Sequence, residues 1–415
     1  MKKFMFQSIV ISALMFAGSA LAADEPEEKE KAKPAWDFKG QALIYYQTAD
    51  GYRDGSLFDQ GPPSQTSGWA RGAGGIQFTG TNKDLVGGVG VGFELSGIST
   101  LGMHNSIVFA PPQNGGGNTG GAITQGYLTY GLSNTSFKVF RQNLPKSLSP
   151  FAFSEGWNMF KNSFDAGLVV NSSLPDTTLV YAYVARRNNS VGDLNDFNKF
   201  YDSDAAHMVT VQNKSIGDLT LTGTYYFLPD ATAAGNADAL WFDAGYKAEH
   251  FTLGFQIGSI GGAAVPEDND AWGAKIAGKI GPVNASLAYS SVGDGTLRIA
   301  NLAGAGVKTP LYTQAVLNQN TIKMDSDTFK LAGSMKGLGG TWVAAYINSD
   351  LGPAALGSVF GLGVGGEGTY QEYELIYKRP IGKHISTFTA LIFQDDDRQA
   401  FGSQTFFRFW LRYNF

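Results

Sequence analysis

Residues 403–415 of the chain read SQTFFRFWLRYNF, and their side chains alternate in kind from one position to the next. The odd positions carry the apolar and aromatic residues Phe407, Phe409, Leu411, Tyr413 and Phe415. The even positions carry Arg408, Trp410, Arg412 and Asn414. A half-buried strand of a soluble protein also alternates, but it rarely presents so aromatic a face ending on a terminal Phe. The segment predicts a β-strand with one face toward lipid and the other toward water.

The same alternation recurs along the chain, separated in turn by short turn-forming segments and by long loops. The expected strands are 38–48, 71–80, 86–97, 122–131, 135–142, 162–171, 176–187, 205–214, 217–228, 239–247, 250–260, 271–280, 282–292, 326–336, 340–349, 368–379, 383–394 and 403–415. We place the turn between the second and third strands at Asn82, Lys83 and Asp84. The pattern predicts an all-β transmembrane antiparallel barrel of about 18 strands, with 16 as the alternative, short periplasmic turns and long extracellular loops.

The composition excludes several classes of chemistry. Only 16% of the 415 residues are charged, 13% are aromatic, 54 are Gly and none is Cys. The absence of Cys excludes disulfides, zinc–thiolate sites, iron–sulfur clusters and cysteine nucleophiles. Four His residues lie scattered without the spacing of a metal site or a catalytic triad. We therefore expect no enzyme activity, no metal and no cofactor.

The N-terminus has the pattern of a secretory signal. Lys2 and Lys3 precede an apolar run, and Ala20-Leu21-Ala22 fits the small-x-small cleavage site. We expect a signal peptide at 1–22, a charged tail at 23–35 and the barrel at 36–415. Removal of Lys2 and Lys3 changes the formal net charge from −5 to −7, which argues against nucleic acid as a partner.

The segment from Phe140 to Lys161 differs from the other long loops because it is aromatic and nearly free of Gly. It carries Phe151, Phe153, Trp157, Met159 and Phe160, which need a surface to pack against. Three short stretches around it and near the C-terminus resemble the OprD-like porins (the Opr family), the eighteen-stranded channels of the bacterial outer membrane. They are Arg141-Gln142 leading into Leu144-Pro145-Lys146-Ser147-Leu148, the hairpin from Tyr377 to Gly382, and Phe393-Gln394-Asp395-Asp396-Asp397-Arg398.

The resemblance implies that the third long loop, at 143–161, folds into the pore and constricts it. Some members of the family guide carboxylate substrates along a ladder of basic residues, although the full arginine ladder is not visible in this sequence. The expected constriction residues are Arg141, Lys146, Phe151, Phe153, Glu155, Trp157 and Lys161.

The charge on the pore wall follows from strand alternation. The basic residues expected to face inward are Lys39, Lys138, Arg186, Lys247, Lys275, Lys279, Lys330, Lys378, Arg408 and Arg412. The acidic ones are Glu94, Asp165, Asp243, Glu372 and Glu374. Alternatively, several of these charges lie at strand ends, because a shift of one residue moves a side chain to the other face.

These features predict a porin in the outer membrane of a Gram-negative bacterium. We expect passive diffusion of small hydrophilic solutes and ions, with a preference for anions or carboxylates. The alternative is a structural or adhesive barrel without an open pore. The expected partners are outer-membrane lipid and small solutes, with no nucleic acid. The sequence does not decide between a monomer and a homotrimer.

Overall fold

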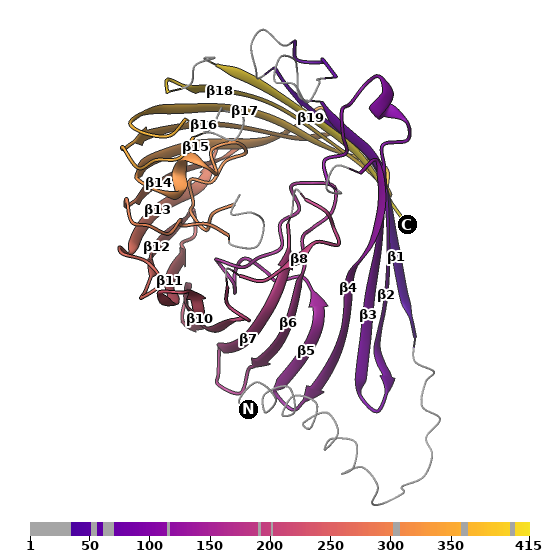
Figure 1. Ribbon diagram of the computed structural model, residues 1–415, viewed down its shortest axis with the longest axis vertical. Helices are drawn as coiled ribbons and strands as arrows, with labels where there is room; N and C mark the ends of the chain where they lie inside the picture. Colours follow the sequence, from indigo (N-terminus) through magenta and orange to yellow (C-terminus); the bar gives the residue numbers. More distant parts are fainter. Residues whose placement is uncertain are drawn as a thin grey trace, which may run out of the picture. The chain divides into compact units, whose positions relative to one another are not determined.

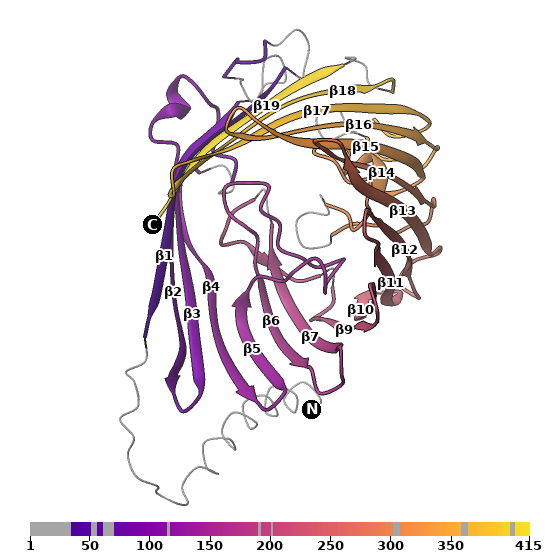
Figure 2. The ribbon, with the colours of Figure 1, turned by 180° about the vertical axis from the view of Figure 1, so that it is seen from behind.

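The computed structural model describes residues 35–50, 56–60, 70–113, 117–189, 192–200, 202–301, 308–357, 364–398 and 403–415. The expected signal peptide at 1–22 and all but the last residue of the expected tail at 23–35 lie outside these ranges. Figures 1 and 2 show the described part of the chain from two opposite sides, with the strands arranged in one continuous wall. In the described ranges, no helix has the length and apolarity required to cross a membrane.

All strands belong to one antiparallel sheet. They are β1 (Asp37–Ala49), β2 (Arg71–Val86), β3 (Val89–Ser99), β4 (Thr119–Leu132), β5 (Thr135–Gln142), β6 (Phe164–Asn171), β7 (Thr177–Asn188), β8 (Phe197–Asn198), β9 (Ala206–Ile216), β10 (Leu219–Thr232), β11 (Gly235–Lys247), β12 (Phe251–Gly261), β13 (Asn269–Ile280), β14 (Val283–Val292), β15 (Ser326–Gly337), β16 (Gly340–Leu351), β17 (Gly368–Ile381), β18 (Ile385–Asp396) and β19 (Gln404–Asn414). Strand β8 has two residues and pairs only with β7, which also pairs with β9. The wall therefore has eighteen full strands, which confirms the predicted fold.

The first and last strands close the sheet into a barrel. The register of β1 and β19 runs from Gln41 opposite Asn414 to Ala49 opposite Phe406. Beyond it, the Gly40 amide donates to the Phe415 carbonyl at 2.8 Å, and the Phe415 amide donates to the Gly40 carbonyl at 3.0 Å. A Cβ at position 40 would lie 2.3 Å from the Phe415 ring, so a larger residue there would require that ring to move. Closure leaves no sheet edge open to pairing with another chain.

The outward face is apolar, as the alternation predicts. Ile257 on β12, Leu287 on β14 and Leu375 on β17 each leave nearly half of their side-chain surface exposed. Near the short-turn end, the Trp36, Phe38, Phe78 and Phe93 rings form one aromatic group with centroid separations of 5.5–6.2 Å. Exposed aliphatic side chains above an aromatic group are typical of a strand surface that contacts a bilayer.

The turn between β2 and β3 lies four residues beyond the predicted position at Asn82, Lys83 and Asp84. The chain reverses at Gly87 and Gly88, whose φ angles of 59° and 84° are readily adopted only by Gly. Asn82 and Asp84 instead form an irregular segment of β2, where the Asn82 side chain accepts from the Asp84 amide. The prediction was wrong because these two side chains bond the backbone locally without reversing it.

Two of the long connections enter the barrel. They are the third loop (residues 143–163) between β5 and β6, and the seventh loop (residues 293–325) between β14 and β15, which the structure describes at 293–301 and 308–325. The described parts of both loops are visible inside the ring of strands in Figure 1. Leu144 and Phe151 of the third loop pack with Phe164, Ala166 and other buried residues of the wall. Val316 and Leu317 of the seventh loop pack on Ile376, Phe388 and Ala390. The faces of β6, β17 and β18 that carry these contacts are therefore the inner faces.

Candidate functional site

Two arginines of β19 hold the tip of the third loop. Arg408 Nη1 donates to the Trp157 carbonyl at 2.8 Å, and Arg408 Nη2 donates to Gln47 Oε1 at 2.7 Å. Arg412 Nη2 donates to the Met159 carbonyl at 3.0 Å. Both arginines point inward because they alternate with Phe407, Phe409 and Leu411. A guanidinium donates through several N–H groups in a fixed plane, so each arginine bonds the loop and the wall together.

The same loop tip packs on an aromatic part of the wall. The Trp157 ring meets the Phe388 ring edge-on at a centroid separation of 5.4 Å and the Trp410 ring at 6.1 Å. The Phe388 and Trp410 rings stack at 3.9 Å. The Lys308 ammonium lies 5.1 Å from the centre of the Trp157 ring, within range of a cation–π contact.

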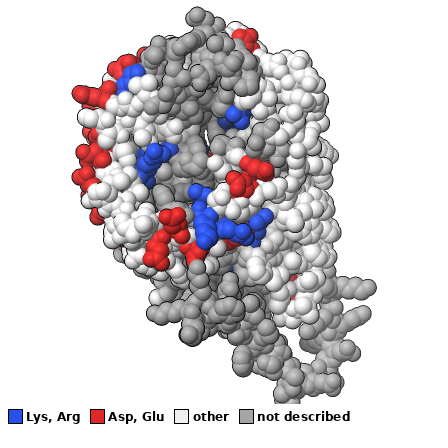
Figure 3. Space-filling model, in the orientation of Figure 1, with Lys and Arg blue, Asp and Glu red and all other residues white. Residues whose placement is uncertain are grey.

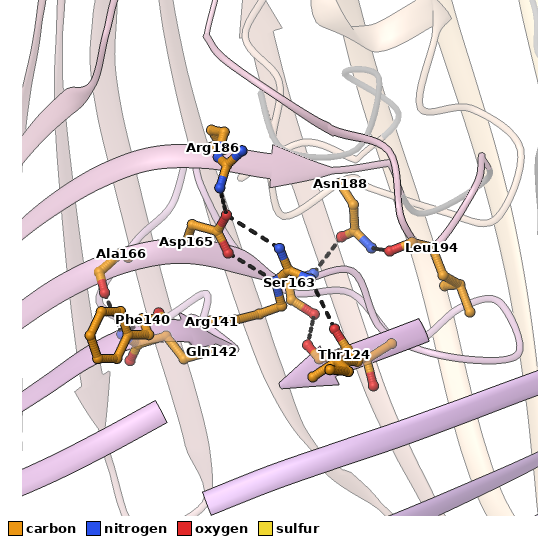
Figure 4. A network of polar contacts seen from close by, with 11 residues as sticks. Thr124, Phe140, Arg141, Gln142, Ser163, Asp165, Ala166, Arg186, Asn188 and Leu194 are labelled. Atoms are coloured by element: carbon orange, nitrogen blue, oxygen red, sulfur yellow. Dashed lines mark hydrogen bonds and ion pairs between the residues drawn. The ribbon is translucent and has the colours of Figure 1, made fainter. Parts of the chain in front are cut away.

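The base of the third loop is fixed on the opposite wall. The Phe151 ring makes edge contacts with Tyr226 at 5.7 Å and Trp241 at 5.3 Å, and the Phe151 amide donates to the Tyr226 hydroxyl at 3.2 Å. Figure 4 shows where the loop leaves the wall: Ser163 Oγ donates to the Thr124 carbonyl, and the Ser163 amide donates to Asn188 Oδ1 at 2.6 Å. The loop is therefore fixed to the wall at Phe151, at its tip and at Ser163.

The seventh loop is held by two buried glutamates of β17. The Val316 amide donates to Glu374 Oε1 at 2.6 Å, and the Leu317 amide donates to Glu372 Oε1 at 2.9 Å. Tyr370 donates its hydroxyl to Glu372 Oε2 at 2.8 Å. These carboxylates were predicted for the pore wall, and the structure uses them as acceptors for loop amides.

The third and seventh loops bond to each other across the interior. Lys146 Nζ donates to the Thr309 carbonyl at 3.0 Å. Asn301 accepts from the Phe153 amide at 3.0 Å and donates to the Phe153 carbonyl at 2.9 Å, as a neighbouring strand would. Lys330 Nζ of β15 adds a bond to the Gln314 carbonyl at 2.8 Å. The two loops thus form a single layer inside the barrel.

Three lysines of this layer have lowered pKa values. Burial, followed by the nearby charge of Arg298, lowers the pKa of Lys323 to about 7. Burial also lowers the pKa of Lys308, and the charge of Glu155 opposes that effect. Loss of hydration in the surrounding protein, followed by the nearby charge of Lys308, lowers the pKa of Lys146 to about 8. Part of the Lys146 side chain nevertheless stays exposed to water. The interior therefore contains cations that are costly to keep charged.

Residues 293–325 were predicted only as one of the long extracellular loops, and the position of the seventh loop inside the barrel was not predicted. Residues 308–325 contain no Gly and include the buried apolar residues Leu311, Val316, Leu317 and Ile322. The third loop was distinguished by its aromatic residues together with its scarcity of Gly. Residues 308–325 share the scarcity of Gly but have Tyr312 as their one aromatic residue, so only a criterion based on apolar residues would have identified this segment.

Three residues predicted for the pore lie on the other face of the wall. Arg141 Nε and Arg186 Nη2 both pair with Asp165, at 2.8 Å each (Figure 4). Phe164 and Ala166 pack on the third loop, so Asp165 between them points outward. On β7 an extra residue separates Val184 from Arg186 in the pairing with β6. This bulge reverses the alternation, which is why the prediction for Arg186 was wrong.

The remaining predicted residues lie on the inner face or near the loop layer. Lys275 and Lys330 flank Ala288 on adjacent strands of one face. Lys161 is exposed, next to the bonded tip of the third loop. Figure 3, in the orientation of Figure 1, shows basic side chains gathered with a few acidic ones around the middle of the visible face of the molecule, and further acidic side chains along its left edge.

The comparisons with known proteins agree with this geometry. A family model described as Gram-negative porin matches residues 9–399. None of the curated protein sequences compared with the chain matches it. Among solved structures, Pseudomonas aeruginosa OccK9 (OpdG) matches with a TM-score of 0.71 and 15% identity, covering 91% of this chain and 98% of its own. Acinetobacter baumannii OccAB3 gives 0.68 and 15%, covering 92% and 99%, and P. aeruginosa OccK8 (OprE) gives 0.67 and 14%, covering 92% and 98%.

These structures share the fold that the resemblance to the OprD-like porins implied, and the family is one of channels rather than enzymes. Short turns of such barrels face the periplasm and long loops face the outside of the cell. The matched family model spans nearly the whole barrel sequence. The chain therefore belongs to the Gram-negative porins, and its place is the bacterial outer membrane.

Proposed function

We propose that the barrel is a passive diffusion channel for small hydrophilic solutes and ions, and that it favours anions, including carboxylates. The third and seventh loops constrict the pore, so a solute must pass the layer that they form. The structure of P. aeruginosa OccK2 (OpdF) in complex with glucuronate supports carboxylates as one class of solute, because glucuronate is a sugar carboxylate bound to a protein of this fold.

The observation that carries the proposal is the charge at this layer. Lys146, Lys308, Lys323, Arg408 and Arg412 gather around the two loops. The carboxylates of Glu372 and Glu374 accept loop amides and are buried, and Lys323 and Arg408 are buried as well. Lys146, Lys308 and Arg412 keep part of their side chains exposed, so cations outnumber carboxylates among the exposed charges of this set. A narrow passage lined by cations attracts anions and repels cations, and the effect is strongest where water is scarce.

The experiment measures the reversal potential of the current through the protein in a planar bilayer under a KCl gradient. We expect stepwise conductance with chloride more permeant than potassium, and measurable current when acetate or glucuronate replaces chloride. A reversal potential that shows potassium to be more permeant than chloride would refute the preference for anions. A correctly assembled barrel that stays silent would favour the structural or adhesive alternative. Each chain closes its own barrel, so the proposal holds for a monomer and for a homotrimer.

A further inference from the structure

Three charged side chains meet on the outer face of the wall, at the long-loop ends of β5, β6 and β7. Asp165 points outward between Phe164 and Ala166, which pack inward. Its carboxylate accepts from Arg141 Nε at 2.8 Å and from Arg186 Nη2 at 2.8 Å. Figure 4 shows the two arginines converging on it from β5 and β7. With two guanidinium groups and one carboxylate, this outer ion cluster (Arg141, Asp165 and Arg186) has a net positive charge.

The two arginines differ in how fully they are bonded. Arg141 Nη2 also donates to Asp165 at 3.3 Å, Arg141 Nη1 donates to the Ile123 carbonyl at 3.0 Å, and the guanidinium carbon lies 3.5 Å from the centre of the Phe197 ring. The Arg186 side chain is 52% exposed. Within the described ranges its polar contact is the bond from Nη2 to Asp165, which leaves the Nε and Nη1 donors without a partner there. Arg186 therefore presents unused donors at the outer surface.

An aromatic group lies on the same face, next to the outer ion cluster on its periplasmic side. Tyr183 is opposite Gly167, two positions along β6 from Asp165. The Tyr183 ring meets the His207 ring edge-on at 5.5 Å, and the Tyr181 hydroxyl bonds His207 Nδ1 at 2.9 Å. Aromatic girdles on such barrels mark the two interfaces of the membrane. The outer ion cluster therefore lies at the level of the lipid headgroups of the outer leaflet.

The wall beside the outer ion cluster carries little side-chain bulk. Gly126 is opposite Arg141, and Gly167 is opposite Val139, all on the outer face. Within 4 Å, a Cβ at position 167 would meet only a Val139 methyl at 4.0 Å, and a Cβ at position 126 only an Ile123 methyl at 3.7 Å. An acyl chain can therefore lie close to the backbone next to the charged groups.

We propose that the outer ion cluster binds the phosphate of an outer-leaflet lipid, with Arg186 as the ligand. Charge-assisted hydrogen bonds from a guanidinium to phosphate are strong, and the Nε and Nη1 donors of Arg186 face the membrane interface. Asp165 and Arg141 position this guanidinium. A net positive charge beside lipid attracts an anionic headgroup, because screening by water is weaker there than in solution. The site lies outside the pore, so it does not depend on which solutes the channel favours.

The test measures binding of diphosphoryl lipid A to the folded protein in a neutral detergent, by native mass spectrometry. This probe combines phosphate groups with acyl chains. We expect Arg186→Gln to bind lipid A at least about fivefold more weakly than the wild type, because charge-assisted hydrogen bonds are lost. The matched control is Arg379→Gln, which removes an outward arginine near a periplasmic turn and should bind like the wild type.

Two results would overturn the site: equal affinity of Arg186→Gln and the wild type, or an equal loss in Arg379→Gln. An excess of inorganic phosphate should displace little lipid A. Complete displacement would indicate a site for free phosphate and would refute the lipid as ligand. If Arg186→Gln does not assemble, Arg186→Lys keeps the charge and removes the planar fork of donors. It should also bind more weakly, and wild-type affinity in Arg186→Lys would contradict the role of the guanidinium.

Discussion

The Arg408 guanidinium donates to the Trp157 carbonyl at 2.8 Å, and its central carbon lies 4.5 Å from the centre of the Trp157 ring. One side chain of the last strand thus holds both the backbone and the ring of a loop that is 251 positions away in the chain. The bilayer-spanning wall and the third loop are therefore fixed to each other at the barrel closure. Arg408 combines a structural contact with a positive charge at the proposed constriction.

Replacement of Arg408 by glutamine should loosen the third loop without preventing assembly of the barrel. The ladder of strand hydrogen bonds does not involve the Arg408 side chain, whereas the bonds to Trp157 and Gln47 do. We expect noisier single-channel current and a weaker preference for chloride. The matched control is Arg379→Gln, on the outer face near a periplasmic turn. Equal behaviour of the two variants in bilayer recordings would contradict the role of Arg408.

An arginine placed one position further along β19, at Phe409, should instead impair assembly of the barrel. Phe409 faces lipid, and an arginine on the lipid face costs about 2–4 kcal/mol near the middle of the bilayer. Phe409→Arg should therefore reduce the fraction of protein that folds into vesicles, measured as the heat-modifiable band on gels. Ser334→Arg is the control, because Ser334 lies on the inner face with Lys330 and Lys336. If Ser334→Arg alone failed to fold, the assignment of the two faces would be wrong.

Local alternation was enough to predict the eighteen strands, because lipid on one side and water on the other act on each residue of a strand independently. The same reasoning failed for Arg186, because a single extra residue on β7 exchanges the faces beyond it and nothing in the local composition marks the bulge. It also failed for Asp165 on β6, which alternates with the inward Phe164 and Ala166. The turn at Gly87 and Gly88 was missed for a similar reason, since Asn82 and Asp84 form local side-chain bonds that mimic a turn signal.

The path of the seventh loop could not be read from short-range patterns. It is determined by Glu372 and Glu374, which lie more than 50 positions after the amides that they accept. The composition of residues 308–325 could have shown that this loop packs against something. It could not have shown the two acceptors.

Removal of these acceptors should release the seventh loop. In the variant Glu372→Ala/Glu374→Ala, the Val316 and Leu317 amides lose hydrogen-bond acceptors that contribute about 0.5–1.5 kcal/mol each. Local opening should then become at least about tenfold more frequent, and trypsin should cleave faster after Lys308 and Lys323. Mass spectrometry of limited digests of the protein in vesicles measures these cuts. Glu94→Gln serves as the control, and cleavage at the wild-type rate in the double variant would show that the glutamates do not hold the loop.

The anion preference should weaken as the pH rises through neutrality. Burial, with a further contribution from Arg298, lowers the pKa of Lys323 from 10.5 to about 7, so the folded protein loses this charge above about pH 7. Between about pH 7 and 10.5 the unfolded chain binds the proton and the folded chain does not, so this group also makes folding more favourable as pH increases.

One unit charge about 8 Å from the ion path is worth about 0.5 kcal/mol in water, which corresponds to roughly a twofold change in the permeability ratio. We expect the chloride-to-potassium ratio to fall by about that factor between pH 6 and 8 in bilayer recordings. Lys323→Gln should have the lower ratio already at pH 6 and a smaller change with pH, the remainder arising from Lys146. A ratio that does not depend on pH in the wild type would show that the charge of Lys323 does not act on the permeating ion.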